Sequence, residues 1–496
     1  MDHQQTKSPI NLTSGFNSTS RTFHSLRPPI HLPPEETPFS AAEYALSLHA
    51  DRSPWPDSIA IINSSTSHKL SYSEFITRIK SLTSYLKNVT KLCKNDTAFI
   101  LCPNSIEVPI LYFSLLSLGV VISPANPISS ESEISHQISL SSPVIAFAVS
   151  KTCHKLPKLK HRTILIDSPE FDSILTMSPA AAATAQQDLE KVTVSQSDSA
   201  AIMYSSGTTG RVKGVVLTHR NLMAVIAGYY PSKQERNSPT VMLYTVPYFH
   251  MFGFFYSFKS VALSETVVVM GRFDLKNMLR AVEKFRVTHL AVAPPVVVAM
   301  TKSDLTDGYD LRFPTVDLWQ GYGLTESTGV LSRSNDPEES RHWGSVGRLT
   351  AACEARIVDA DTGDALPPGK QGELWVRGPT IMKGYVGEPE ATSTSLDPDG
   401  WLRTGDLCYI DEEEIADAAV IPYPDEEAGQ VPMAFVVKQS ESRINERGVM
   451  DFVAKQVAPF KKVRRVEFVS AIPKSPAGKI LRKELRKMFP MPSSKM

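Results

Sequence analysis

The sequence lacks the features that mark several common classes of protein. Its five cysteines form no CxxC pair and no cluster with histidine, and they lie at irregular spacing, at Cys93, Cys102, Cys153, Cys353 and Cys408. That pattern fits a reducing compartment without structural zinc. The charges cancel, with 52 Lys and Arg against 52 Asp and Glu. No basic field therefore predicts a nucleic acid or an anionic membrane as a partner.

Long apolar runs are also missing. The longest, VPILYFSLLSLGVVIS, is interrupted by Pro109 and Gly119 and is too short to span a bilayer. It predicts a buried helix followed by a strand, and no integral membrane segment. The first forty residues have no basic stretch followed by an apolar one, so no signal peptide is expected.

The chain is long enough for two or more domains around large cores, with 496 residues of which 42% are hydrophobic. Helical and strand-like patterns alternate from Ser40 onwards, which predicts an open α/β sheet with ligand loops at the strand ends. Residues Leu275, Met278, Leu279, Val282 and Phe285 share one face of an expected helix.

Three segments are expected in order along the chain. Residues 1–38, rich in Pro, Ser, Thr and Asn, predict a flexible segment. Residues 39–406 predict a large domain of stacked α/β sheets with a β-rich part near its end. Residues 407–496 predict a small α+β domain, in which a helix turns Val449, Phe452, Val453 and Val457 inward and a basic helix starts at Ile480.

The stretch SSGTTGRVKG, from Ser205 to Gly214, has the composition of a phosphate-binding loop. Glycines allow backbone amides to converge on an anion, and the neighbouring side chains add hydroxyl donors and a cation. It lacks the Gly-Lys-Ser/Thr ending of a Walker A loop. A flexible surface turn is the alternative. Because the loop follows the apolar stretch SAAIMYSS and leads back into buried structure, phosphate binding is favoured.

Three further stretches carry residues suited to a nucleotide. In QGYGLTES, small and aromatic residues could accept a flat heterocycle while Thr325 and Glu326 face a phosphate and Mg²⁺; an N-cap at Thr325 is the alternative. In GWLRTGDL, Asp406 could accept both ribose hydroxyls or cap a turn. In PKSPAGKILRKEL, Lys479 lies between a Pro/Gly loop and a helix, and an ordinary surface lysine is the alternative.

In this order, the four stretches resemble the adenylate-forming acyl-CoA synthetase superfamily, and within it the plant 4-coumarate:CoA ligase and ligase-like group. The resemblance runs from about Ser40 to the C-terminus. It implies that a carboxylic acid attacks the α-phosphate of ATP, giving an acyl-adenylate and pyrophosphate, and that coenzyme A then displaces AMP. The glycine-rich loop would hold the β- and γ-phosphates. Such a reaction needs positioning and charge stabilisation, and no protein nucleophile.

The resemblance also implies roles for individual residues. The phosphates would be held by Ser205, Ser206, Gly207, Thr208, Thr209, Gly210 and Lys213. AMP would be held by Gln320, Gly321, Tyr322 and Thr325, with Asp406 on its ribose and Glu326 on Mg²⁺. Lys479 would bridge carboxylate and phosphate during adenylation. The acid would lie between His250, Phe252 and Gly321, and the CoA phosphate near Arg272. A purely structural His250 is the alternative.

The chain departs from that family at two places. Leu311 runs almost directly into Phe313, where the family has a helix and a glycine-rich strand start that line the acid pocket. Glu413 is followed at once by EIADAAVIPYP, where the family has a hinge, a ribose-binding arginine and a lysine on the CoA side. The hinge lets the C-terminal domain rotate between half-reactions. We therefore expect weak or no ligase activity from the chain as written. Exon skipping or a gene-model error is the simplest origin of both joins.

The leading hypothesis is a monomeric, ATP-dependent acid:CoA ligase for a hydroxycinnamate or a fatty or oxylipin acid. Phe252 offers no hydroxyl to a phenolic ring, which tilts the expectation mildly to apolar acids. The first alternative is a catalytically impaired isoform that binds nucleotide or a partner. The second is an adenylating enzyme with another acceptor, such as a luciferase-like oxygenase or a carrier-protein loader. No carrier domain follows Lys479, which disfavours loading.

The last three residues, Ser494, Lys495 and Met496, differ from Ser-Lys-Leu only at the final position. Met is close to Leu in size and polarity, so the tripeptide predicts a peroxisomal address read by the import receptor. A cytoplasmic location is the alternative, in which case the tripeptide is a chance ending.

Overall fold

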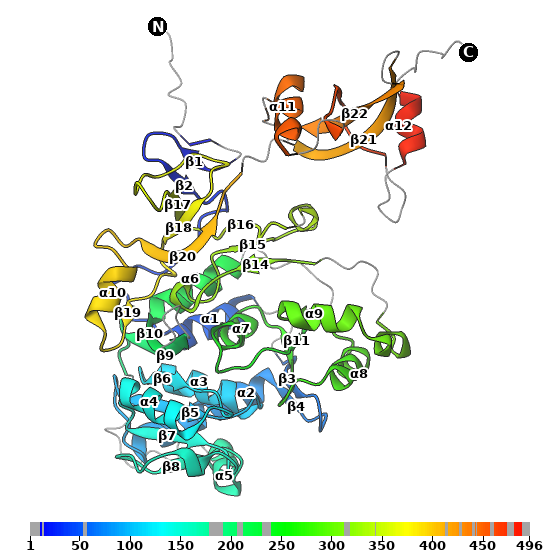
Figure 1. Cartoon of the computed structure of the whole chain (residues 1–496). Helices are drawn as coiled ribbons and strands as arrows, with labels where there is room; N and C mark the ends of the chain where they lie inside the picture. Colours follow the sequence, from blue (N-terminus) through cyan, green and yellow to red (C-terminus); the bar gives the residue numbers. More distant parts are fainter. Residues whose placement is uncertain are drawn as a thin grey trace. The chain divides into compact units, whose positions relative to one another are not determined.

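The computed structural model divides the chain into two compact units (Figure 1). Unit 1 comprises residues 1–26, 355–374 and 405–496, and unit 2 comprises residues 27–354 and 375–404. The structure describes residues 10–11, 14–52, 57–177, 192–205, 212–230, 240–311, 318–342, 344–411, 415–425, 429–438, 442, 444–456, 461–473 and 481–488. Helices and mixed sheets alternate along unit 2, which confirms the predicted α/β class. The predicted boundaries after residues 38 and 406 stay predictions.

The largest sheet of unit 2 has seven strands in the order β19-β10-β9-β6-β5-β7-β8. They are β5 (Thr97–Leu101), β6 (Val121–Pro124), β7 (Ile145–Ala148), β8 (Thr163–Leu165), β9 (Ser199–Ser205), β10 (Lys213–Thr218) and β19 (Gly384–Tyr385). β5 to β9 pair in parallel, and β10 and β19 are antiparallel additions at one edge. The sequences TAFIL and IAFA are apolar and almost wholly buried, because a parallel sheet is covered on both faces.

A second sheet of unit 2 has the order β13-β11-β12-β3-β4. Its strands are β3 (Ile59–Asn63), β4 (Lys69–Ser71), β11 (Val241–Tyr244), β12 (Thr266–Val269) and β13 (His289–Ala291), and all but β4 run in parallel. Helix α8 (Leu275–Phe285) packs its apolar stripe on this sheet, in a cluster with Leu243 and Val268. The predicted inward face of α8 is therefore confirmed.

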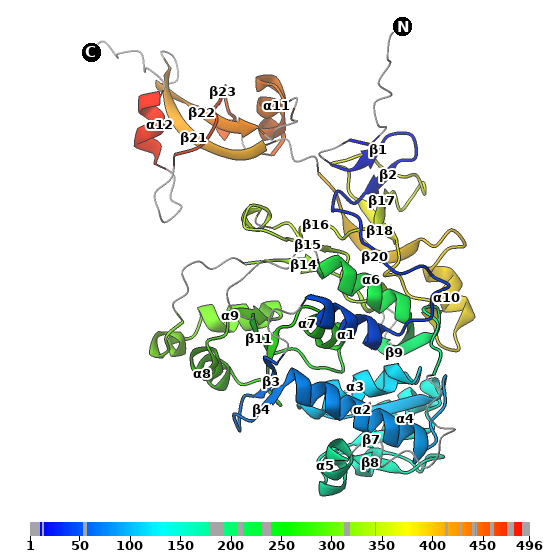
Figure 2. The same ribbon diagram turned by 180° about the vertical axis from the view of Figure 1, so that it is seen from behind.

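The other helices of unit 2 cover the sheets (Figure 2). They are α1 (Ala41–Arg52), α2 (Tyr72–Asn88), α3 (Glu107–Ser117), α4 (Glu131–Ser141), α5 (Pro169–Thr176), α6 (His219–Tyr229), α7 (Met251–Ala262), α9 (Pro294–Thr301) and α10 (Pro389–Ser395). The ring of Phe113 on α3 lies 5.5 Å from Phe75 on α2 and 5.0 Å from Phe258 on α7, so aromatic contacts join the three helices. Within the described ranges, no helix is long and apolar enough to cross a bilayer.

Helix α9 lies just before the first predicted gap in the chain. Its sequence PPVVVAMT is apolar, yet none of these eight residues is buried and Val298 is 48% exposed. The preceding strand β13 forms an edge of its sheet. A helix with this composition normally packs against a further element. Val296 and Met300 pack on the cluster of α8, so α9 is covered on one side only. The predicted loss of a helix and a strand after Leu311 stays a prediction.

A third sheet has five strands in the order β1-β2-β17-β18-β20. The strands are β1 (Phe16–Asn17), β2 (Thr22–His24), β17 (Glu354–Val358), β18 (Gly372–Arg377) and β20 (Leu402–Cys408). Residues 16–24 of the segment predicted to be flexible thus form β1 and β2, and Phe23 is fully buried. The prediction for residues 1–9 lies outside the described residues.

The end of the chain forms a three-stranded sheet in the order β21-β22-β23, with β21 (Ile415–Asp425), β22 (Gly429–Lys438) and β23 (Arg465–Phe468). Phe435 packs toward Leu485 on helix α12 (Arg482–Met488), and Val436 packs toward Val449 on helix α11 (Glu446–Gln456). The two helices therefore cover opposite faces of the sheet.

The prediction that Phe452 turns toward the core of this module is wrong. Phe452 is 61% exposed, whereas Val449 is buried and Val453 is partly buried. At about 100° per residue, Phe452 lies roughly 60° around α11 from Val449, on the side away from the sheet contact. Val420, on the same sheet, is 45% exposed. Val457 and Ile480 lie outside the described residues.

A buried histidine marks the start of α6. His219 is fully buried, and its Nδ1 accepts a hydrogen bond of 3.1 Å from the backbone N–H of Ala41. Its Nε2 has no hydrogen-bond partner in the part of the chain that the structure describes. Burial lowers the pKa of His219 to about 4, against the opposing charge of Asp198. The folded protein therefore keeps this ring neutral.

We predict that His219 makes folding sensitive to acid. Between pH 6.5 and 4 the unfolded chain protonates this histidine and the folded chain does not, so the free energy of unfolding falls with falling pH, by up to about 3 kcal/mol. Urea unfolding at pH 7.5, 6 and 5 measures this. His219→Asn should flatten the pH dependence, while the exposed His68→Asn should leave it unchanged. An equal slope in wild type and His219→Asn would contradict the assignment.

Candidate functional site

The structure places both ends of the glycine-rich loop. Strands β9 and β10 form an antiparallel pair in which Ser205 and Lys213 are directly opposite each other. The residues between them that were predicted to hold phosphate, Ser206, Gly207, Thr208, Thr209 and Gly210, lie outside the described residues. The loop therefore joins the end of β9 to the start of β10. The hydroxyl of Ser205 and the ammonium of Lys213 lie on its two sides.

The predicted AMP segment enters as a short strand. Strand β14 (Gly321–Tyr322) pairs with β15 (Ser332–Arg333), which pairs with β16 (Arg348–Leu349). The carbonyl of Gln320 accepts a hydrogen bond from the N–H of Ser334 at 2.9 Å. A side chain on Gly323 would bring its Cβ to 2.4 Å from the carbonyl oxygen of Gly329, so this close approach requires glycine.

A 3₁₀ turn, η6 (Thr325–Ser327), follows this strand and carries Glu326. Leu324, not Thr325, occupies the N-cap position, so the alternative capping role of Thr325 is not observed. The N–H of Met382 donates a 2.8 Å hydrogen bond to the backbone carbonyl of Glu326. The position of the Glu326 backbone is therefore fixed from a second segment of unit 2.

The carboxylate of Glu326 receives two hydrogen bonds on one oxygen. The Ser205 hydroxyl donates to Oε1 at 2.9 Å, and the Tyr385 hydroxyl donates to the same oxygen at 3.0 Å. The ring of Tyr385 also lies under the Lys213 ammonium, 4.7 Å from Nζ to the ring centroid. The structure thus brings together three predicted residues, Ser205, Lys213 and Glu326.

Tyr385 was missed by the sequence reasoning. It lies in the stretch KGY, which carries no chemical signal of its own. Its place comes from the pairing of β19 with β10, which puts Tyr385 opposite Val215 and therefore diagonal to Lys213 on the same face of the sheet. A pairing between strands about 170 positions apart is not visible in local sequence patterns.

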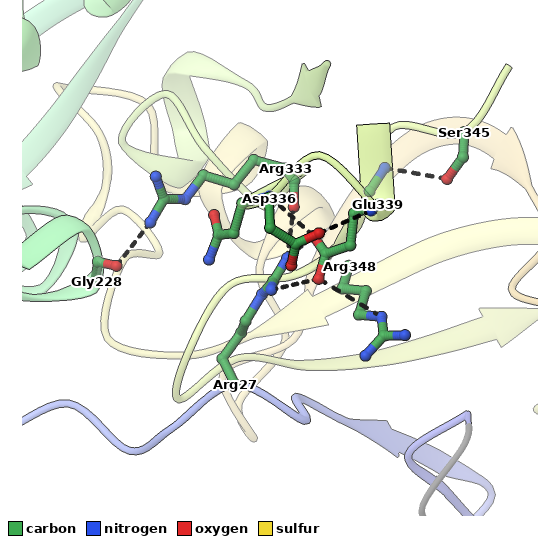
Figure 3. A network of polar contacts seen from close by, with 9 residues as sticks. Arg27, Gly228, Arg333, Asp336, Glu339, Ser345 and Arg348 are labelled. Atoms are coloured by element: carbon green, nitrogen blue, oxygen red, sulfur yellow. Dashed lines mark hydrogen bonds and ion pairs between the residues drawn. The ribbon is translucent and has the colours of Figure 1, made fainter. Parts of the chain in front are cut away.

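A buried ion pair contacts strand β15, the partner of the strand in the predicted AMP segment (Figure 3). The guanidinium of Arg27 donates to both carboxylate oxygens of Glu339, at 2.6 and 2.5 Å, and to the carbonyl of Arg333 at 2.8 Å. The Arg333 side chain donates to the carbonyl of Gly228 at 2.8 Å and stacks on the ring of Tyr229. Because β15 pairs with β14, these contacts hold the strand that carries Gly321 and Tyr322.

Helix α7 carries the two residues predicted to border the acid. His250 is its N-cap, and its Nδ1 accepts a 3.3 Å hydrogen bond from the N–H of Phe252. Desolvation lowers the pKa of His250, which favours a neutral ring at neutral pH. The Phe252 ring meets that of Tyr256 edge-on at 4.7 Å. Gly329, just after η6, leaves room for the Phe255 ring, so α7 packs against the AMP segment.

The roles of three further predicted residues are not tested by the structure. Arg272 is exposed between β12 and α8. Asp406 is exposed in β20 and belongs to unit 1, whereas Glu326 and Ser205 belong to unit 2. Lys479 lies outside the described residues. Their predicted roles toward CoA, ribose and the reacting carboxylate stay predictions.

The donor set at Glu326 fits Mg²⁺ held partly by substrate. A carboxylate and a hydroxyl are hard oxygen donors, which Mg²⁺ prefers. No group of three or more His, Cys, Asp or Glu side chains suited to a metal occurs among the residues that are described. A full protein cage for the ion is thus lacking there, and Mg²⁺ usually takes one or two carboxylates together with substrate phosphates.

The fold and this site define the class of adenylate-forming α/β enzymes. Solved structures match it at low identity: an Archaeoglobus fulgidus long-chain-fatty-acid-CoA ligase, FadD1, with TM-score 0.66 and 21% identity, covers 90% of this chain and 100% of its own. ATP-bound MatB from Rhodopseudomonas palustris has TM-score 0.64 and 23% identity, with 91% and 99% covered.

Two family models match the sequence itself. The AMP-binding enzyme model matches residues 48–312 and 302–386, and the model of the AMP-binding enzyme C-terminal domain matches residues 408–479. The chain is 47% identical to 4-coumarate–CoA ligase-like 9 of Arabidopsis thaliana, over 97% of each chain, and 44% identical to 4-coumarate–CoA ligase-like 6 of Oryza sativa, over 95% and 91%. The chain belongs to the AMP-binding enzymes. Within them it is a member of the AMP-forming acid–CoA ligase family, which uses ATP and CoA as substrates.

The comparisons also bear on the two predicted gaps. The alignment to the Arabidopsis relative extends over 548 positions, 52 more than the 496 residues of this chain. At least that many positions of the relative therefore have no counterpart inside this chain. The AMP-binding model matches in two segments, residues 48–312 and 302–386, which overlap beside the predicted first join at Leu311 and Phe313.

We predict that Glu326→Gln weakens ATP binding about tenfold when Mg²⁺ is present. In EDTA the affinity should change by less than about threefold, because only the bound metal ion needs the negative charge of Glu326. Isothermal titration of the purified chain with ATP, with and without Mg²⁺, measures both constants. Glu338→Gln, an exposed carboxylate in the same segment, is the matched control and should behave as wild type. An equal loss of affinity under both conditions would argue against a metal role.

Proposed function

We propose that this chain is an ATP-dependent carboxylic acid:CoA ligase that acts through an acyl-adenylate and releases pyrophosphate and AMP. The observation that carries the proposal is the meeting of Ser205, Lys213 and Glu326 at the two ends of a glycine-rich loop. In such a site the loop and the cation hold the β- and γ-phosphates of ATP, and the carboxylate holds a metal ion. This arrangement suits the release of the two phosphates together as pyrophosphate.

We propose the other roles from the motifs that this chain shares with the family. Ser205 to Gly210 and Lys213 hold the β- and γ-phosphates. Gln320, Gly321, Tyr322 and Thr325 hold AMP, and Glu326 takes Mg²⁺. Asp406 binds the ribose, Lys479 bridges the acid and the α-phosphate, and Arg272 meets the CoA phosphate. The neutral His250 borders the carboxylate of the acid, where a neutral donor orients the nucleophile without neutralising it.

We further propose an apolar acid, a fatty or oxylipin chain, ahead of a hydroxycinnamate. The face of α7 after His250 carries the half-buried rings of Phe252 and Tyr256, packed on the buried ring of Phe255. The one cation on that helix, Lys259, is buried and paired with Glu265 at 2.5 Å. Such a surface rewards apolar contact. A relative that is 37% identical over 97% of this chain carries the name peroxisomal OPC-8:0-CoA ligase 1, of Arabidopsis thaliana, which supports this choice.

A catalytically impaired isoform is the second candidate, favoured by one observation. At least 52 positions of the Arabidopsis relative, 548 aligned positions less 496 residues, have no counterpart in this chain. The predicted hinge falls in the second gap, after Glu413. Without a hinge, the C-terminal module cannot alternate between the two half-reactions, so thioester formation should suffer more than adenylation.

The test is acid-dependent ATP–pyrophosphate exchange alongside thioester formation, with cinnamic, medium-chain and cyclopentyl-alkanoic acids. Two proteins are compared: the chain as written, and a version in which both gaps are filled with the matching segments of the Arabidopsis relative. We expect thioester formation at least about 100-fold faster in the filled version, with a smaller gain in exchange. Equal activities would refute the impaired reading, and inactivity of both proteins on every acid would refute the ligase proposal.

We also propose a peroxisomal location through Ser494, Lys495 and Met496, which lie outside the described residues. A fluorescent protein fused ahead of the chain should mark peroxisomes in plant cells, because the terminal tripeptide stays free. Removing the three residues should move the signal to the cytoplasm, while Met496→Leu should keep it in peroxisomes. A signal that does not respond to the deletion would contradict the address.

A further inference from the structure

Tyr385 lies between two groups of opposite charge in the candidate nucleotide site. Its hydroxyl donates to Oε1 of Glu326 at 3.0 Å, and its ring lies 4.7 Å from the Nζ atom of Lys213. All three side chains are half-buried. Among the described residues Lys213 forms no ion pair, although a carboxylate contacts the hydroxyl of the same tyrosine.

The backbone fixes this ring in place. The N–H of Tyr385 donates to the Thr392 hydroxyl at 2.9 Å, and the N–H of Val386 donates to the carbonyl of Gly214 at 2.8 Å. A Cβ on Gly214 would lie only 2.6 Å from the side chain of Val386, so glycine lets β19 approach β10 closely. The ring is therefore held by two neighbouring strands and a helix.

The hydroxyl is fixed as a donor. An ionised carboxylate can only accept a hydrogen bond, so the proton in the contact with Glu326 belongs to the Tyr385 hydroxyl. A protonated phenol can donate to a carboxylate, while its ring face attracts an ammonium group. One side chain thereby satisfies both charges without letting them meet.

We infer that Tyr385 is a positioning residue that keeps Lys213 and Glu326 apart, so that the ammonium stays available to phosphate and the carboxylate to Mg²⁺. This inference rests on the proposed nucleotide site. Without the ring, a flexible lysine in a half-buried site closes onto the nearest carboxylate, because charges attract more strongly away from bulk water. ATP would then have to break that ion pair before it could bind.

The inference predicts a specific pattern of ATP affinities, measured on the full chain by isothermal titration in EDTA. Tyr385→Phe keeps the ring and should bind ATP within about twofold of wild type, whereas Tyr385→Leu should bind about tenfold more weakly. Adding Glu326→Gln to Tyr385→Leu removes the trapping carboxylate. The double variant should therefore return to within about twofold of Glu326→Gln alone.

The controls separate this effect from general damage. Tyr409→Leu removes an exposed tyrosine from unit 1 and should leave ATP affinity unchanged. Rescue by Glu326→Gln is a readout that a merely structural tyrosine would not give, since a second substitution does not repair misfolding. Tyr385→Phe tests the ring even if Tyr385→Leu does not fold: a tenfold loss in the Phe variant overturns the inference.

The outcomes also distinguish this inference from the proposed function. A wild-type chain that does not bind ATP refutes the nucleotide site and this inference together. If the wild-type chain binds ATP, two results refute the positioning role alone. In the first, the Tyr385→Leu variant binds ATP as well as wild type. In the second, adding Glu326→Gln does not restore the affinity that Tyr385→Leu lost.

Discussion

The carboxylate of Glu326 holds the candidate site together. Two hydroxyls, from the end of β9 and from β19, converge on one of its oxygens, and its backbone is tied to Met382. Hydrogen bonds to a charged group contribute about 1.5–3 kcal/mol each when the geometry is kept. Three distant stretches of chain therefore share one anchor, and both hydroxyl donors bind the same carboxylate oxygen.

That anchor depends on rigid surroundings. Parallel strands filled with Val, Ile, Ala and Phe make the large sheet a fixed frame, and the close backbone contact at Gly323 leaves η6 little freedom. The buried Arg27–Glu339 pair fixes β15 from the other side. The reaction class needs such a frame because its rate comes from alignment and charge placement. The two predicted gaps, after Leu311 and after Glu413, remove none of the strands of the large sheet. The sheet therefore persists in this chain.

Much of this arrangement could be predicted from the sequence. The glycine-rich loop, the predicted AMP segment and the inward face of α8 show local patterns of composition or periodicity. The structure confirms the helix, and it joins Ser205 to Glu326 directly and Lys213 to Glu326 through Tyr385, while the roles of these residues stay predictions. Tyr385 could not be found this way, because its role comes from strand pairing across the fold. Phe452 was assigned wrongly because helical spacing marks an apolar stripe and does not say how wide a face the neighbouring sheet covers.

The Arg27–Glu339 pair has a consequence for how the protein is made. Its partners are 312 positions apart in the chain, so the contact can close only after two thirds of the protein has left the ribosome. Contacts this distant in sequence form late and slow the folding of the segments that rely on them. Six of the seven strands of the large sheet, β5 to β10, are complete by Thr218 and can pair during synthesis, whereas β19 follows only at Gly384. Strands β14 and β15 and the strand that carries Tyr385 join later, so the nascent chain first carries a partial sheet without the candidate site.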